Sequence, residues 1–108
     1  MDEKTRTKSG MQMTMTRDGD KLTVAVVGRV DSTNAPKFNE DIINALDGVT
    51  DLVLDLEDLD YISSSGLRVL MIAQTVMNNQ GTMEITNVTD SVMEVLEMTG
   101  FADCLTIL

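Results

Sequence analysis

The apolar residues of this chain follow two spacings, one typical of strands and the other of helices. From Met11 to Met15 every second residue is apolar, which predicts a strand with one buried face. Leu22–Val27 is nearly all apolar and predicts a second strand, which we expect Gly28 to end. The Asp-Gly pair at Asp18-Gly19, between the two segments, is typical of a tight hairpin turn.

Three later segments have apolar residues three and four positions apart and are predicted to be helices. Proline is well tolerated in a first helical turn, so Pro36 marks the start of the first helix. Glycine commonly ends helices, as we expect for Gly48 and Gly100. We expect the helices to begin near Thr33, near Ser65 and near Asp90 or Ser91, and to end at Asp47-Gly48, Asn79 and Gly100, the middle one being the longest.

The remaining apolar segments predict further strands. Asp51–Leu56 is apolar on both faces, which indicates a central strand, while Met83–Thr86 is expected to be a fourth strand and Cys104–Leu108 a last short one. Strands that alternate with helices in this way predict an α/β domain, with a mixed four- to five-stranded sheet and three or more helices packed on it. We expect residues 11–108 to form this single domain, and the polar residues 1–10 to be a flexible tail.

Charge and composition argue against several classes of function. The 108 residues include 18 acidic and 8 basic side chains, a net charge of −10, which does not suit a nucleic-acid or anionic-membrane surface. No apolar stretch is long enough to span a bilayer. Histidine is absent, which removes the Ser-His-Asp and Cys-His pairs and most zinc and iron sites, so we expect no enzyme, no metal site and no cofactor. With Cys104 as the one cysteine, expected to be buried, the chain resembles a cytoplasmic protein.

The strongest candidate site is the serine run Ser63–Ser65, followed by Gly66 and the longest predicted helix. One serine can cap the helix, and the other two hydroxyls then lie at the positive end of the helix dipole, where a phosphate is favoured. A cap followed by two turn residues is the simpler alternative. The loop Gly28–Thr33 is a second candidate, with an ordinary turn as its alternative, and the acidic residues from Asp55 to Asp60 are expected to form a solvated rim.

Three segments, in this order and spacing, resemble the STAS family, the sulphate-transporter and anti-sigma-factor-antagonist domain. They are Gly28–Ala35, Leu52–Leu59 with Tyr61–Leu67, and Val95–Phe101, and the resemblance covers nearly the whole chain after residue 10. Within that family the chain looks like a stand-alone bacterial anti-sigma factor antagonist, also called an anti-anti-sigma factor. The resemblance implies a STAS-like fold.

The family's switch motif is Asp-Ser-Ser-Gly, and the anti-sigma factor phosphorylates its first serine. In this chain that position is Ser64, followed by Ser65 and Gly66. Ser63 replaces the family's aspartate and is a competing acceptor. The resemblance also places Asp31, the acidic residue of the family's first loop, near the phosphorylation site.

The mechanism that this resemblance implies is partner switching, a form of transcription regulation. The unphosphorylated protein binds an anti-sigma factor with serine kinase activity and frees a sigma factor. Phosphorylation by that partner ends the binding, and a metal-dependent serine phosphatase restores it. We expect a monomer or weak dimer whose partner-binding residues are Asp31, Ser32, Ser63, Ser65, Gly66 and Arg68.

The same residues also fit another class of protein. A STAS-type sensor of an anion or small ligand, or a soluble subunit of a transport assembly, would carry serines that are not phosphorylated. In such a protein the turn from Ser64 to Gly66 would bind an anion through its backbone N–H groups.

Overall fold

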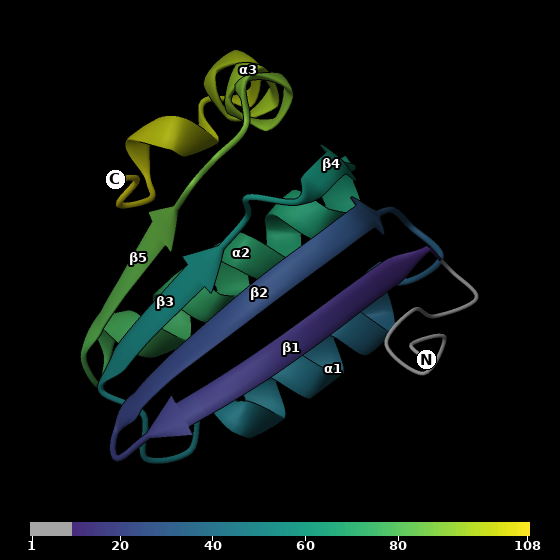
Figure 1. The fold of residues 1–108 in the computed structure, drawn as a ribbon. Coiled ribbons are helices and arrows are strands. Elements are labelled where there is room, and N and C mark those ends of the chain that lie inside the picture. The colour runs from purple at the N-terminus through teal and green to yellow at the C-terminus, as the bar shows by residue number, and fades with distance from the viewer. Residues whose placement is uncertain (1–9) are drawn as a thin grey trace.

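The computed structural model describes residues 10–108, which form a mixed sheet with two helices on one face and a third beyond one end of the strands (Figure 1). Of the tail expected at residues 1–10, only Gly10 is among the described residues, so that division of the chain stays a prediction. The described strands are β1 (Met11–Asp18), β2 (Lys21–Val30), β3 (Asp51–Asp55), β4 (Leu59–Ile62) and β5 (Thr82–Thr86). The described helices are α1 (Ala35–Ala45), α2 (Ser64–Asn78) and α3 (Asp90–Thr99), followed by a 3₁₀ turn at Phe101–Asp103.

The sheet has the order β1-β2-β3-β5, and β4 also pairs with β2. Only β1 is antiparallel to its neighbour among the described strands, so the prediction of a mixed α/β sheet is confirmed. Along one side of β2, residues Lys21–Ala25 pair with β3 and residues Gly28–Val30 pair with β4. The segment 51–62 therefore follows the whole length of β2 in two strands.

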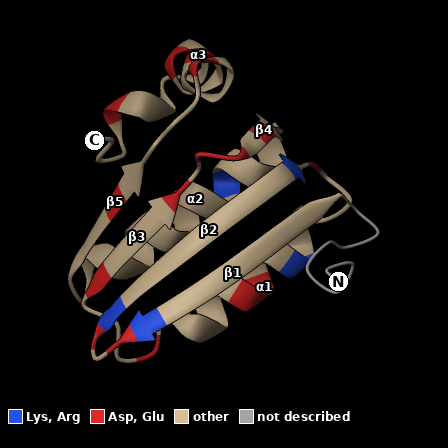
Figure 2. Ribbon diagram, in the orientation of Figure 1, with Lys and Arg blue, Asp and Glu red and all other residues tan. Residues whose placement is uncertain are grey.

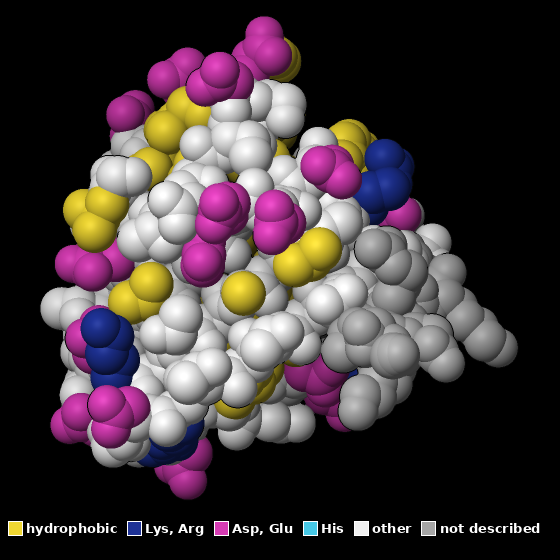
Figure 3. Space-filling model, viewed as in Figure 1, with side chains coloured by type: hydrophobic (Ala, Val, Ile, Leu, Met, Phe, Trp, Pro, Cys, Tyr) yellow, Lys and Arg dark blue, Asp and Glu magenta, His cyan; other side chains and the backbone are white. Residues whose placement is uncertain are grey.

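The core lies between the sheet and the helices α1 and α2, which cover the same face in Figure 1. Leu52 and Leu54 of β3 are fully buried, and β3 lies between β2 and β5, which confirms its predicted central place. The opposite face of the sheet carries no helix in Figure 1. In Figure 3 that view shows mainly backbone and uncharged polar side chains, with scattered apolar and acidic side chains and a few basic ones. Val53 on that face is half-buried, so the strand is not fully covered on both sides as its apolar run suggested.

Gly28 does not end the second strand, and that prediction is wrong. The strand continues to Val30, with a shift of register between Gly28 and Arg29 in the pairing with β4. Gly28 has a φ of 94°, and a Cβ at this position would overlap the Gly10 carbonyl oxygen. Glycine at this register shift thus allows a positive φ and the close approach of a second backbone, both of which glycine tolerates better than any other residue.

The structure also contains one strand that was not predicted, and it contradicts two expectations at the C-terminal end of the chain. The segment Leu59–Ile62 is a strand that the apolar pattern did not reveal. The last strand, expected at Cys104–Leu108, is reduced to a single parallel bridge between Ile107 and Ile85 because the 3₁₀ turn leaves few residues to reach β5. Cys104 lies in this exposed segment and is not buried.

Candidate functional site

The two candidate loops come together because β2 and β4 are parallel neighbours whose carboxyl ends meet at one edge of the sheet. Val30 is paired with Ile62, and the chain leaves these strands as Asp31 and Ser63. The Ser63 backbone N–H donates to the Val30 carbonyl oxygen at 2.8 Å, which ties the two loops directly. Such crevices beyond the carboxyl ends of parallel strands are where α/β proteins commonly bind their ligands.

The three serines have different positions at the start of α2. Ser63 is the N-cap, with its Oγ accepting from the Gly66 backbone N–H at 3.2 Å and its carbonyl oxygen accepting from Leu67 at 2.9 Å. Ser64 is the first helical residue and is exposed, while Ser65 is half-buried. The cap and a free hydroxyl at the positive end of the helix are therefore provided by different residues.

Gly66 allows the first turn of α2 to lie directly on the ends of two strands. A Cβ at this position would stand 2.7 Å from Cγ1 of both Ile62 and Val30, closer than side chains normally approach. Gly66 is also buried. Its observed contribution is this close packing, and direct contact between Gly66 and a partner stays a prediction.

The loop after β2 is held by a reciprocal pair of side chains. The Asp31 carboxylate accepts from the backbone N–H groups of Thr33 at 3.0 Å and Asn34 at 3.3 Å. The Asn34 side chain accepts from the Asp31 N–H and donates to the Arg29 carbonyl oxygen, both at 2.9 Å. Asn34 precedes α1 but its side chain does not cap that helix. The loop is thus a fixed turn that carries Ser32 at its exposed tip.

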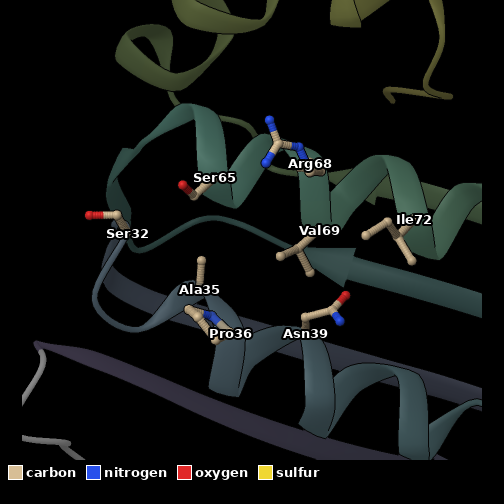
Figure 4. A pocket seen from close by; sticks show the side chains of 8 residues that line it. All are labelled: Ser32, Ala35, Pro36, Asn39, Ser65, Arg68, Val69 and Ile72. Carbon is tan, nitrogen blue, oxygen red and sulfur yellow. The ribbon is translucent and has the colours of Figure 1, made fainter.

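A shallow groove of about 240 Å³ lies between the N-terminal halves of α1 and α2 (Figure 4). It brings together three residues predicted from the sequence, Ser32, Ser65 and Arg68. The sequence analysis did not identify the other lining residues, Ala35, Pro36, Asn39, Val69 and Ile72. Asp31, Ser63 and Gly66 do not line the groove and lie in the loop and helix start that shape its end.

The two arginines near the site, Arg29 and Arg68, differ in their contacts. The Arg29 guanidinium lies 4.5 Å from the centre of the Tyr61 ring, a cation–π contact. Arg68 is exposed and forms no ion pair or hydrogen bond with the residues from 10 to 108. Figure 2 shows how sparse the basic side chains are beside the acidic ones.

The acidic residues from the end of β3 to Asp60 are half-buried or exposed, and the first of them holds a turn. The Asp55 carboxylate accepts from the Glu57 backbone N–H and from the Asn87 side chain, both at 3.1 Å. Within the described part of the chain, no group of three or more acidic or cysteine side chains is arranged to hold a metal ion. None of the helices described has the length and apolar character needed to cross a bilayer.

Comparison with known proteins gives a consistent match. The model of the STAS domain family matches residues 12–107. BtrV of Bordetella bronchiseptica, described as an anti-sigma factor antagonist, is 38% identical over 93 residues, covering 84% of this chain and 80% of BtrV.

Solved structures show the same fold at lower identity. The crystal structure of an anti-sigma factor antagonist from Mycobacterium paratuberculosis has a TM-score of 0.82 at 17% identity, covering 94% of this chain and 88% of that one. SpoIIAA in its unphosphorylated form has a TM-score of 0.77 at 16% identity, covering 89% and 87% of the two chains. The phosphorylated form of SpoIIAA from Bacillus has a TM-score of 0.70 at 15% identity, covering 89% and 90%.

Proposed function

Because the chain belongs to the STAS domain family, we propose that it is an anti-sigma factor antagonist, which binds an anti-sigma factor and thereby frees a sigma factor. The names of its relatives support this assignment. The observation that carries it is the exposed Ser64 hydroxyl on the first turn of α2, beside the fixed loop that begins at Asp31. The protein acts in the bacterial cytoplasm, by binding and not by catalysis.

The switch is the phosphorylation of Ser64 by the anti-sigma factor, which uses its own ATP and magnesium. The Ser64 hydroxyl oxygen bonds to the γ-phosphorus of ATP, the bond from that phosphorus to ADP breaks, and the hydroxyl proton is released. A metal-dependent serine phosphatase then hydrolyses the phosphoserine, with water supplying the new oxygen of inorganic phosphate. The chain itself needs no cofactor for either step.

The structure supports Ser64 over Ser63 as the acceptor. Ser64 is exposed, whereas Ser63 is half-buried and its Oγ is engaged by the Gly66 backbone N–H. Serine and aspartate are both favoured N-caps, so Ser63 can cap α2 as the family's aspartate would. The negative charge of the aspartate is lost in this replacement. We therefore propose that the cap is retained and that the partner recognises an uncharged residue before the acceptor.

A phosphate on Ser64 changes the surface more than the fold. It adds about −1.5 to −2 charges, and a negative group at the positive end of a helix is stabilised by about 0.3–1 kcal/mol. SpoIIAA has been solved with and without its phosphate, and both forms match the fold of this chain. The added anion stands at the start of α2, next to the loop that begins with the acidic Asp31, so a partner that fits the unmodified surface meets a bulky charge there instead.

The proposed contact surface consists of the loop after β2 and the first turns of α2. Ser32 and Ser65 line the groove, and Ser64 is exposed at the start of α2. Their small side chains leave the helix start open to a partner. The proposed partner-binding residues are Asp31, Ser32, Ser63, Ser65, Gly66 and Arg68.

The proposal is tested by measuring whether the chain displaces a sigma factor from an anti-sigma kinase of the source genome. The wild type and Ser64→Ala are expected to displace the sigma factor, and Ser64→Asp is expected to do so more weakly. Ser91→Asp is a matched control because Ser91 is also an exposed serine in the first turn of a helix, α3. Failure of the wild type with every such kinase, together with binding of inorganic phosphate at the turn Ser64–Gly66, would favour the anion-sensor interpretation.

A further inference from the structure

Arg68 is the one basic residue among positions 38–108 of a chain with a net charge of −10. It lines the groove between α1 and α2, and none of the eight lining side chains is acidic. The one charged side chain that lines the groove is therefore a cation, on a molecule whose net charge is negative. A guanidinium exposed there, with no hydrogen-bond or ion-pair partner among residues 10–108, is available to a carboxylate from another protein.

The rest of the groove is small and combines apolar side chains with the short polar side chains of Ser32, Asn39 and Ser65. Pro36, Val69 and Ile72 form its walls, and the Ile72 side chain is 38% exposed. The Asn39 side chain extends from α1 toward α2 in Figure 4, and its buried Oδ1 accepts no hydrogen bond from residues 10–108. The volume of about 240 Å³ is below the range of about 300–1,000 Å³ usual for small-molecule pockets. It suits one apolar side chain and an adjoining polar group of a protein segment.

We propose that this groove binds a segment of the anti-sigma partner that presents an apolar side chain next to a carboxylate. The apolar side chain lies between Pro36 and Ile72, and the carboxylate pairs with the Arg68 guanidinium, whose planar fork matches carboxylate geometry. This inference rests on the proposed function and names the chemistry by which the partner is recognised. A second copy of the chain is a poorer occupant because two surfaces of a strongly acidic protein repel each other.

The same guanidinium also links the groove to the phosphorylation switch. Ser64 and Arg68 are four residues apart on α2, so their side chains lie one above the other on the same face. In Figure 4 the Arg68 side chain extends toward the N-terminal turn of the helix, the side on which Ser65 lies. A phosphate on Ser64 and the partner's carboxylate therefore compete for Arg68. Phosphorylation weakens binding by withdrawing this cation from the groove.

The first test measures the affinity of an anti-sigma kinase that binds the wild type for Arg68→Gln and Arg68→Lys. Loss of a charge-assisted pair predicts that Arg68→Gln binds about tenfold more weakly or worse, with a smaller loss for Arg68→Lys. Lys21→Gln is the control because Lys21 is exposed at the far end of β2 and changes the net charge equally. Equal affinities of Arg68→Gln and Lys21→Gln would overturn this inference and leave the proposed function intact.

The second test measures the coupling between the two positions. Ser64→Asp is introduced into the wild type and into Arg68→Gln, and the fold-loss in affinity is compared. The inference predicts a clearly smaller loss in the Arg68→Gln background, because the cation that the new charge would withdraw is already absent. The same loss in both backgrounds would overturn the competition. No binding by the wild type itself would overturn the proposed function together with this inference.

Discussion

Replacing Ser63 with alanine removes the side-chain oxygen that accepts a hydrogen bond from the Gly66 N–H at the start of α2. Loss of a serine N-cap costs about 0.5–2 kcal/mol, typically about 1 kcal/mol. A single bond of 3.2 Å at a half-buried position favours the middle of that range. For a domain of this size, 1 kcal/mol corresponds to a fall in the melting temperature of about 4–8 °C.

Ser64→Ala is the matched control because it removes a neighbouring hydroxyl that is exposed and caps nothing. Its free energy of unfolding is expected to stay within about 0.5 kcal/mol of the wild type. Ser63→Asp keeps an acceptor at the cap and adds a negative charge at the positive end of the helix. Its free energy of unfolding is expected to be up to about 0.3–1 kcal/mol higher than that of the wild type at low ionic strength, and this gain is expected to fall as salt is added.

Urea denaturation followed by circular dichroism measures all three variants, with an unchanged slope showing that the unfolding transition itself is the same. The reasoning is refuted if Ser63→Ala unfolds like the wild type while Ser64→Ala loses about 1 kcal/mol. Ser64 would then be the cap, and its hydroxyl would no longer be the one left free for phosphorylation.

Three further predictions concern the start of α2, the loop after β2 and the first nine residues of the chain. Gly66→Ala gains about 1 kcal/mol of helix propensity but forces a Cβ onto Ile62 and Val30, an overpacking that costs about 1–3 kcal/mol. Denaturation is therefore expected to show a lower free energy of unfolding, and a higher one would contradict the packing. Asp31→Ala is expected to lose about 1 kcal/mol of stability, because the Asp31 carboxylate accepts two backbone N–H hydrogen bonds. It is also expected to bind the partner more weakly, and an unchanged affinity would show that Asp31 is not part of the interface. Deletion of residues 1–9 is expected to leave the melting temperature almost unchanged, since they offer no apolar periodicity to bury, and a large fall would show that they are docked.

Features set by local sequence could be predicted well. The helix expected at Ser65–Asn79 is observed at Ser64–Asn78, since the serine run and the long apolar stripe define its start and its length. The strand expected at Asp51–Leu56 is observed at Asp51–Asp55 in the centre of the sheet. In both cases the periodicity and the end signals lie within the segment itself.

Features that depend on distant segments could not be predicted in this way. The strand β4 has only four residues, with Asp60 and Tyr61 both exposed, so it lacks the alternation of a half-buried strand. The groove depends on the approach of α1 to α2, and neither Asn39 nor Ile72 carries a local signal of it. Family resemblance supplied the prediction that Ser64 is the acceptor, but it gave no information about these walls.

The central claim is that Ser64 is the switch of an anti-sigma factor antagonist, and site-resolved mass spectrometry tests it most directly. The wild type, Ser63→Ala and Ser64→Ala are each incubated with a cognate anti-sigma kinase, ATP and magnesium. We predict one phosphate, located on Ser64, in the wild type and in Ser63→Ala, and none in Ser64→Ala. A phosphate located on Ser63, or none on the wild type with any cognate kinase, would contradict the account.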